Sequence, residues 1–368
     1  MVSDKAAAAV SSGFLFATCQ VGAEGALKSE IRRRWPALRF AYSRPGFLTF
    51  KAPAALAADE PFALDCVFAR AWAHSLGKAT AHGVGARARE VWKLAAGVPC
   101  EAIHVWQRDM ARPGWRGFEP HFTPAAVQIE AALRTHWPAG QGTREAAHPR
   151  IAQPGQRVLD CVLVEADEWW VGWHRATTNE SCVPGGVFDI ALPEHAVSRA
   201  YLKMAEALSW SDLPLARGER IAELGCAPGG ASQALLDRGL HVVGIDPALV
   251  DPRVLAHPHF THVQKRAADV RRREFRGVAW LAADMNIAPD STLDAVEAIV
   301  THPAVNVRGL LLTLKLLDWS LAEAVPDYLA RVRRWGYTNV RARQLAFNRQ
   351  EICVTALRAV TKRRKRAR

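Results

Sequence analysis

A glycine-rich turn between two apolar runs is the feature that most constrains the fold of this chain. Residues 220–224 have the pattern of a short buried strand, and the turn Gly225-Cys-Ala-Pro-Gly-Gly230 and a helical segment, 231–238, follow. A second apolar run, 241–245, ends at Asp246. A strand that breaks into a glycine turn and then a helix leaves backbone amides facing a crevice at the carboxyl edge of a parallel sheet. The pattern predicts an α/β, Rossmann-like domain with a nucleotide site at this turn.

The spacing of the glycines indicates which nucleotide is bound. Three non-glycine residues separate Gly225 from Gly229, unlike the Gly-x-Gly-x-x-Gly that brings the backbone against a pyrophosphate. Glu223 at the strand end would repel a phosphate but suits a ligand with an amine and a sulfonium, and Asp246 can accept both ribose hydroxyls. These features favour S-adenosylmethionine (SAM) over NAD; the alternative is a tight turn without a ligand. The expected contacts are Glu223, Gly225, Ala227, Pro228, Gly229, Gly230 and Asp246.

Four charged residues are candidate catalytic groups for this site. Lys203 lies in an amphipathic segment before the glycine strand, and Asp284 and Lys315 end two apolar runs, 278–283 and 309–314. Glu351 opens a third apolar run. Because carboxyl ends of parallel strands converge on one crevice, Asp284 and Lys315 are both expected to face the ligand. The alternative for any one of the four is an ordinary ion pair at a strand edge.

These motifs resemble those of a known enzyme family. Ser198-Arg-x-x-x-Lys203, the glycine turn, Asp284, Lys315 and Arg349-x-Glu351 are similar to the Lys-Asp-Lys-Glu set of FtsJ-like RNA 2'-O-ribose methyltransferases. The whole chain resembles the bacterial large-subunit ribosomal RNA methyltransferase M family, which couples such a domain to an N-terminal RNA-binding region with a THUMP domain. The resemblance implies that SAM methylates a cytidine 2'-hydroxyl of 23S rRNA or of a large-subunit precursor, without a metal.

The same resemblance implies roles for individual residues. Ser198, Asp269 and Asp284 join the expected cofactor site, and Lys203, Asp284, Lys315 and Glu351 become the catalytic set. Lys315 is the candidate base for the ribose proton, since a nearby lysine and a sulfonium would lower its pKa toward the working range. Asp284 would raise the pKa of Lys315, so we expect it to orient Lys315 while Glu351 holds Lys203. The sequence does not settle which effect on the pKa of Lys315 is larger.

Two other function classes, methylation of an RNA base and binding of SAM or RNA without turnover, stay open from the sequence. An amino-group base methyltransferase typically has Asn/Asp-Pro-Pro-Tyr/Phe where this chain has Asp284-Met-Asn-Ile, and a cytosine C5 enzyme needs a cysteine nucleophile, for which Cys226 and Cys353 are poorly set. A SAM-binding or RNA-binding protein without turnover would have lost at least one of the four charged residues. All four are present, which favours an RNA ribose methyltransferase.

Composition agrees with a partner that is a polyanion. The chain of 368 residues has a formal net charge of +12, and its 49% hydrophobic residues include no run near the ~20 residues of a membrane span. The tail 361–368 is strongly basic, and Arg271 to Arg273 and the arginines at 331, 333 and 334 are further candidates for phosphate contacts or for solvated faces. Seven cysteines without a Cys-x-x-Cys pair argue against zinc and disulfides, so we expect a cytoplasmic protein.

The N-terminal half has the pattern of two small mixed modules. Residues 1–88 begin with a β-α-β-β pattern, which predicts a ferredoxin-like α+β domain, and 89–180 contain alternating strands and a helix, which we assign to a THUMP-like RNA-binding domain. A glycine-rich linker then leads to the catalytic domain, 187–360. Trp169, Trp170 and Trp173 could stack on unpaired bases, but core packing is the expected role. The sequence does not indicate an oligomeric state.

Overall fold

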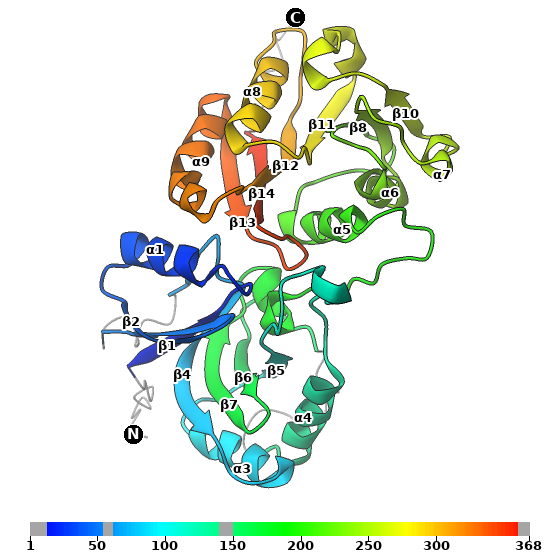
Figure 1. Cartoon of the computed structure of the whole chain (residues 1–368). Helices are drawn as coiled ribbons and strands as arrows, with labels where there is room; N and C mark the ends of the chain where they lie inside the picture. The colour runs from blue at the N-terminus through cyan, green and yellow to red at the C-terminus, as the bar shows by residue number, and fades with distance from the viewer. Residues whose placement is uncertain (1–12, 54–61, 140–149, 360–368) are drawn as a thin grey trace, which may run out of the picture. The chain divides into compact units, whose positions relative to one another are not determined.

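The computed structural model describes residues 13–53, 62–139 and 150–359 (Figure 1). These residues divide into two compact units, with the boundary between Asp189 and Ile190. Each unit is built around one seven-stranded sheet. The segment predicted as catalytic, 187–360, falls almost entirely in the second unit, and the predicted basic tail, 361–368, lies outside the described residues.

The sheet of the first unit has the strand order β2-β3-β1-β4-β7-β6-β5. Its strands are β1 (Phe14–Thr18), β2 (Arg39–Arg44), β3 (Phe47–Lys51), β4 (Ala71–Ala79), β5 (Ala102–Gln107), β6 (Arg157–Glu165) and β7 (Glu168–Arg175). Neighbouring strands are antiparallel except β5 and β6, whose parallel pairing requires a crossover connection. The hairpins β2–β3 and β6–β7 close at Pro45-Gly46 and Ala166-Asp167.

Within the described residues, three α-helices accompany the sheet of the first unit. They are α1 (Glu24–Arg34), α3 (Val84–Leu94) and α4 (Pro124–Thr135), of which α4 lies in the crossover between β5 and β6. The helices α3 and α4 pack over Trp169 and Trp173, whereas Trp170 lies on the other face of β7 with Phe47. The three tryptophans are 1%, 4% and 9% exposed in that order, so the prediction that they belong to the core is confirmed.

The sheet of the first unit is continuous across the predicted boundary at 88/89, because β4 pairs with β7. The sequence analysis missed both β4 and α3. The strand β4 has no strict apolar–polar alternation and contains Gly77, which weakens the sequence signal of a strand. The division of this half into two modules and the THUMP-like assignment stay predictions.

The sheet of the second unit has the strand order β10-β9-β8-β11-β12-β14-β13. Its strands are β8 (Arg220–Leu224), β9 (His241–Ile245), β10 (Phe260–Val263), β11 (Val278–Ala283), β12 (Gly309–Lys315), β13 (Tyr337–Arg343) and β14 (Glu351–Arg358). The strands β8 to β12 pair in parallel, and β14 is antiparallel to both β12 and β13. The predicted Rossmann-like α/β fold is confirmed.

Helices cover both faces of this mixed sheet (Figure 1). They are α5 (Ala200–Ser211), α6 (Gly230–Asp237), α7 (Pro252–Leu255), α8 (Pro289–Val300) and α9 (Val325–Arg334). The helices α5 and α6 pack against each other, and α8 packs against α9. The chain runs outward from β8 to β10 in one direction and from β11 to β12 in the other, so β8 and β11 flank the point where the strand order reverses. Ligands of such sheets bind at the carboxyl ends of the strands at this point.

Candidate active site

The glycine turn follows β8 at the reversal of strand order. Gly229 has a φ of 119°, a backbone conformation that residues other than glycine rarely adopt. It is the N-cap residue of α6 and makes no side-chain hydrogen bond there. A Cβ on Gly230 would lie 2.2 Å from Ser198 Oγ, and one on Gly225 would lie 2.8 Å from the carbonyl oxygen of Asp284. The bare Cα atoms therefore let Ser198 and Asp284 approach the turn closely. Separately, the N-cap residue Gly229 has no side chain to cap the first amides of α6.

Asp246 shapes the same turn from the end of β9. Its Oδ2 accepts a hydrogen bond from the amide of Ala227 at 3.1 Å, and its Oδ1 accepts one from the amide of Ala248 at 2.8 Å. A carboxylate oxygen has more than one lone pair, so each can accept a further hydrogen bond from a ribose hydroxyl. Asp246 is half-buried and thus open to a ligand on one side.

Glu223 lies beneath the turn with 1% of its surface exposed. Ser232 Oγ of α6 lies 2.5 Å from its Oε2, and Oε1 has no hydrogen-bond partner among the described residues. Burial raises the pKa of Glu223 to about 8, and the charges of Asp284 and Asp246 add to this effect. Glu223 is therefore mostly protonated at pH 7, so a full negative charge is not what attracts a cationic ligand to this position. Its place in a cofactor site stays a prediction.

The four predicted catalytic side chains meet in one cluster. Lys203 Nζ lies 3.2 Å from Glu351 Oε1 and makes a shorter contact with Asp284 Oδ2. Lys315 Nζ lies 2.8 Å from Asp284 Oδ1 and makes a shorter contact with Glu351 Oε2. Each lysine thus contacts both carboxylates, whereas the sequence analysis assigned one carboxylate to each lysine. We call these four side chains the charge ring; they alternate in sign and sum to zero.

The fold explains why these four side chains converge. Asp284 and Lys315 lie at the carboxyl ends of the parallel strands β11 and β12, and Lys203 reaches them from α5. Glu351 begins β14, and the antiparallel pairing of β14 with β12 places Glu351 directly opposite Lys315. A strand that starts, rather than ends, at this edge can therefore contribute to the same crevice.

The electrostatics of the charge ring contradict one prediction. Burial opposes ionisation of Asp284 and Glu351, but the two lysines outweigh it and hold the pKa of each carboxyl group below its usual value. Burial also disfavours the Lys315 ammonium, yet the charges of Asp284 and Glu351 raise the pKa of Lys315 above its usual value. The expectation that the pKa of Lys315 lies near neutrality is therefore wrong in this arrangement, because two carboxylates at contact distance outweigh one nearby lysine.

One buried residue that supports the ring is not predicted from the sequence. Asn348 is 1% exposed, and its Nδ2 donates to Glu351 Oε1 at 3.3 Å while its Oδ1 accepts from the amide of Leu345 at 3.0 Å. These bonds fix the loop before β14 and the orientation of the Glu351 carboxylate. A buried asparagine three residues before a catalytic candidate has no sequence signal of its own.

Two predicted cofactor contacts and one predicted RNA contact lie outside the charge ring. Ser198 contacts the glycine turn near Gly230 and accepts a hydrogen bond from the amide of Ala200 at 3.3 Å. Asp269 is exposed in the 3₁₀ turn Ala267–Asp269 that follows β10. Arg331, a predicted RNA contact, forms ion pairs with Asp294 and Glu297 of α8, so its charge is already partnered.

Within the described ranges, one buried group has side chains close enough to hold a metal ion: His104, Asp160 and His174. His174 Nδ1 lies 2.6 Å from Asp160 Oδ2, and its Nε2 lies 2.8 Å from the carbonyl oxygen of Ser181. Burial raises the pKa of Asp160, and the charge of His174 opposes that shift. With Asp160 ionised, both partners are acceptors, so both ring nitrogens donate and the ring is an imidazolium. A metal ligand must be a neutral imidazole, so this geometry favours a buried ion pair in the first unit.

A family model described as FtsJ-like methyltransferase matches residues 196–326. The matched range contains the glycine turn and three members of the charge ring, Lys203, Asp284 and Lys315. Glu351 lies beyond the matched range, at the start of β14, which is antiparallel to β12.

None of the helices in the described ranges combines the length and the apolar character that a membrane crossing demands.

Curated relatives share the printed name "Ribosomal RNA large subunit methyltransferase M". The relative from Halorhodospira halophila is 28% identical over 94% of this chain and 97% of its own length. The relatives from Azoarcus sp. and Marinobacter nauticus are each 30% identical, and the alignments span 57% and 62% of those proteins, less than two thirds. The relative from Laribacter hongkongensis is 30% identical over 68% of this chain and 69% of its own length. The chain therefore belongs to the ribosomal RNA large subunit methyltransferase M family.

Proposed function

We propose that this protein transfers a methyl group from SAM to a ribose 2'-hydroxyl of ribosomal RNA, with a cytidine of 23S rRNA as the target nucleotide. The relatives' printed name supports ribosomal RNA as the substrate. The observation that carries the proposal is the charge ring at the carboxyl ends of β11 and β12, beside the glycine turn of β8. Such a substrate would place the enzyme in the cytoplasm.

The residues around the turn fit SAM. The uncapped amides of α6, the half-buried Asp246 and the free lone pairs of its carboxylate offer donors and acceptors together, as a ligand with an adenosine and an amino acid requires. Gly225, Ala227, Pro228, Gly229 and Gly230 would form the floor of the site. When bound, SAM supplies an electrophilic methyl group.

The charge ring would prepare the ribose hydroxyl for methylation. Methyl transfer needs the 2'-oxygen held in one orientation and its proton removed as the new bond forms. Lys315 is the most exposed member of the ring, with 17% of its side chain accessible, against 11% for Lys203. We assign Lys315 the role of proton acceptor. Asp284 and Glu351 both contact its Nζ, and we assign them the role of positioning it.

The raised pKa of Lys315 has a consequence for the rate. A lysine between two carboxylates holds its proton at neutral pH, and only the neutral amine can accept the proton of the hydroxyl. The methylation rate should therefore rise with pH through the range from 7 to 9, and a cationic cofactor beside the ring would shift this rise to lower pH.

The geometry disfavours a cytosine C5 enzyme and a binding protein without turnover. Burial raises the pKa of both Cys226 and Cys353, which disfavours the thiolate that a cytosine C5 enzyme needs. A binding protein without turnover would have no use for four buried charged groups, whose burial is costly, in one ring.

The experiment that tests the proposed function maps ribose methylation over all ribosomal RNA from cells with and without the gene. We expect one cytidine of 23S rRNA to lose its 2'-O-methyl group in the deletion strain and to regain it when the gene returns. An unchanged ribose-methylation map, or the loss of a base methyl group, would refute the proposal.

A further inference from the structure

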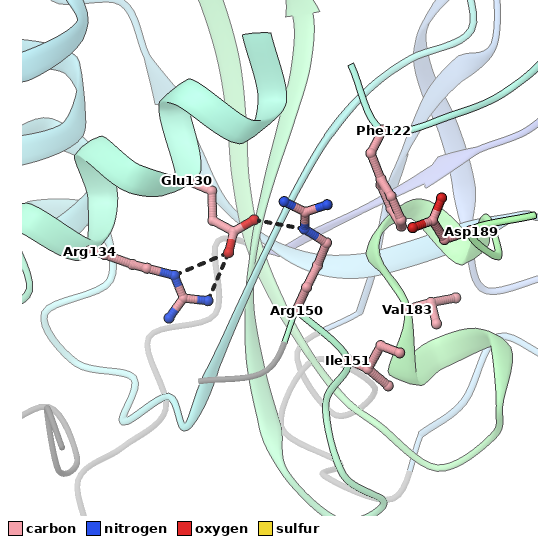
Figure 2. A pocket seen from close by; sticks show the side chains of 7 residues that line it. All are labelled: Phe122, Glu130, Arg134, Arg150, Ile151, Val183 and Asp189. Carbon is pink, nitrogen blue, oxygen red and sulfur yellow. Dashed lines mark hydrogen bonds and ion pairs between the residues drawn. The ribbon is translucent and has the colours of Figure 1, made fainter. Parts of the chain in front are cut away.

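A second candidate site lies in the first unit, whereas the charge ring and the glycine turn belong to the second (Figure 2). It is a pocket of about 440 Å³ beside α4 and the segment that ends at Asp189. This volume is in the usual range for small-ligand sites. Phe122, Ile151 and Val183 form its apolar part. Ile151 has 54% of its surface exposed, so the pocket presents apolar surface to a ligand.

The polar part of the pocket is held in place by one buried carboxylate. Glu130 of α4 is 8% exposed and binds two guanidinium groups, as the dashed lines in Figure 2 show. Arg134 donates to Glu130 Oε1 from Nε at 3.1 Å and from Nη2 at 2.8 Å. Arg150 donates to Oε2 through Nε at 3.3 Å, so its two terminal nitrogens are not used in that bond. Glu130 therefore restrains both arginines before any ligand arrives, which lowers the entropic cost of binding.

Arg150 also contacts the aromatic ring of the pocket. Its guanidinium carbon lies 5.0 Å from the centroid of the Phe122 ring. Phe122 is half-buried, and Arg150 has 36% of its side chain exposed. Guanidinium planes and aromatic faces are the two surfaces on which proteins stack unpaired bases. A flat heterocycle can extend this stack.

The charge of the pocket restricts the class of ligand. Two arginines and two carboxylates, Glu130 and Asp189, sum to zero, so the pocket has no net attraction for a phosphate or another anion. A neutral, flat ligand with both donors and acceptors at its edges fits better. Nucleobases have this character, since ring nitrogens and carbonyl oxygens can accept from Arg150 and amino groups can donate to Asp189.

We propose that this pocket binds one unpaired nucleobase of the RNA substrate. The proposal rests on the proposed function only in taking RNA as the substrate. A base held in the first unit would give the enzyme a contact with single-stranded RNA that is independent of the methylated ribose. A free nucleotide has the same chemistry, and the experiment separates the two sources.

The test measures binding of a short single-stranded RNA of mixed sequence to the full-length protein, without SAM, by fluorescence anisotropy. Phe122→Leu removes the stacking face and Arg150→Gln removes the charged donor. Arg89→Gln is the matched control, because Arg89 is exposed on α3 in the same unit and does not line the pocket. We expect the first two variants to raise the dissociation constant for the single strand by about 5- to 100-fold, the usual effect of losing one stacked base. Arg89→Gln should change it by less than about twofold.

Three results would overturn the proposal. Wild-type affinity in both pocket variants would exclude the pocket as an RNA contact. An equal loss of affinity for a duplex of the same sequence would show that the variants act on backbone contacts or on folding. Binding of nucleoside monophosphates as tightly as the single strand, with the same sensitivity to Phe122→Leu, would assign the pocket to a free nucleotide.

The outcome is separable from the proposed function. Binding is measured without SAM, so methyl transfer does not enter this readout, and ribose methylation of ribosomal RNA is scored in a separate assay. A pocket that binds RNA in a protein that methylates no ribose would refute the proposed function and support this inference.

Discussion

Replacing Glu223 with glutamine should remove a large pH dependence from the stability of the second unit. The carboxyl group is 1% exposed, and burial raises its pKa to about 8, from 4.5 in the unfolded chain. Because the folded state holds a proton that the unfolded state releases, stability falls as pH rises from about 4.5 to about 8 and then levels off. Glutamine has the same shape and stays neutral at every pH.

The magnitude follows from the two pKa values. A carboxyl that titrates near 8 in the folded state and near 4.5 unfolded costs the folded state about 2 to 3 kcal/mol between pH 6 and pH 9. Glu223→Gln should therefore gain about this much over the wild type across that interval. In a urea titration the gain corresponds to a midpoint shift of about 1 M.

The assay is urea denaturation at pH 6, 7, 8 and 9, followed by circular dichroism, for the wild type and Glu223→Gln. Ser232→Ala is a second probe, since the Ser232 hydroxyl lowers the pKa of Glu223. Without it, the fall in stability should extend to higher pH. Parallel stability curves for the wild type and Glu223→Gln would refute the reasoning, because Glu223 would then have the same pKa in both states.

Three further variants test separate parts of the structure. Asp246→Ala should weaken SAM about tenfold by calorimetry and leave RNA affinity unchanged; an effect on RNA alone would contradict the role of Asp246. Gly230→Ala should destabilise the protein by about 1 to 3 kcal/mol, because its Cβ would lie 2.2 Å from Ser198 Oγ; an unchanged melting temperature would show that the turn adapts. Asp160→Asn should cost about 3 to 5 kcal/mol below pH 6.5, since it strands the His174 imidazolium. Burial lowers the pKa of His174, but Asp160 raises it by more. The stability that the ion pair gives the wild type should therefore be lost as pH rises through the raised pKa of His174. Equal losses of stability in Asp160→Asn at pH 6 and pH 10 would contradict the ion pair.

The sequence predicted the second unit well because its signals are local. Each apolar run from 220 to 315 is buried on both faces of a parallel sheet, so it appears as a continuous hydrophobic stretch that ends where the crevice begins. Asp284 and Lys315 follow such stretches directly, and their convergence is a consequence of parallel strands.

Closure of the charge ring could not be predicted in this way. Glu351 reaches Lys315 only because β14 returns antiparallel to β12, and no local pattern records which strand a segment pairs with. The pKa of Lys315 depends on this closure, since the second carboxylate comes from Glu351. Asn348 depends on it as well, because its role is to orient Glu351.

The first unit was harder to predict for a related physical reason. Its strand β4 connects the two predicted modules through non-local pairing with β1 and β7, and its sequence lacks a clean alternation. The pocket beside α4 draws Phe122, Arg150 and Asp189 from three separate loops, so only the folded chain brings their chemistry together.

The most direct test of the charge ring's proposed role is a methylation assay with purified protein, unmethylated 23S rRNA and SAM labelled on its methyl carbon, for the wild type and Lys315→Arg. A 2'-O-methyl group blocks alkaline cleavage of the neighbouring phosphodiester, so the wild type should place the label in alkali-resistant dinucleotides. Arginine keeps the charge but cannot accept a proton near neutral pH, so the variant should bind SAM normally and lose about 100- to 10,000-fold in rate. Label in mononucleotides, or a Lys315→Arg rate within about tenfold of the wild type, would contradict the account.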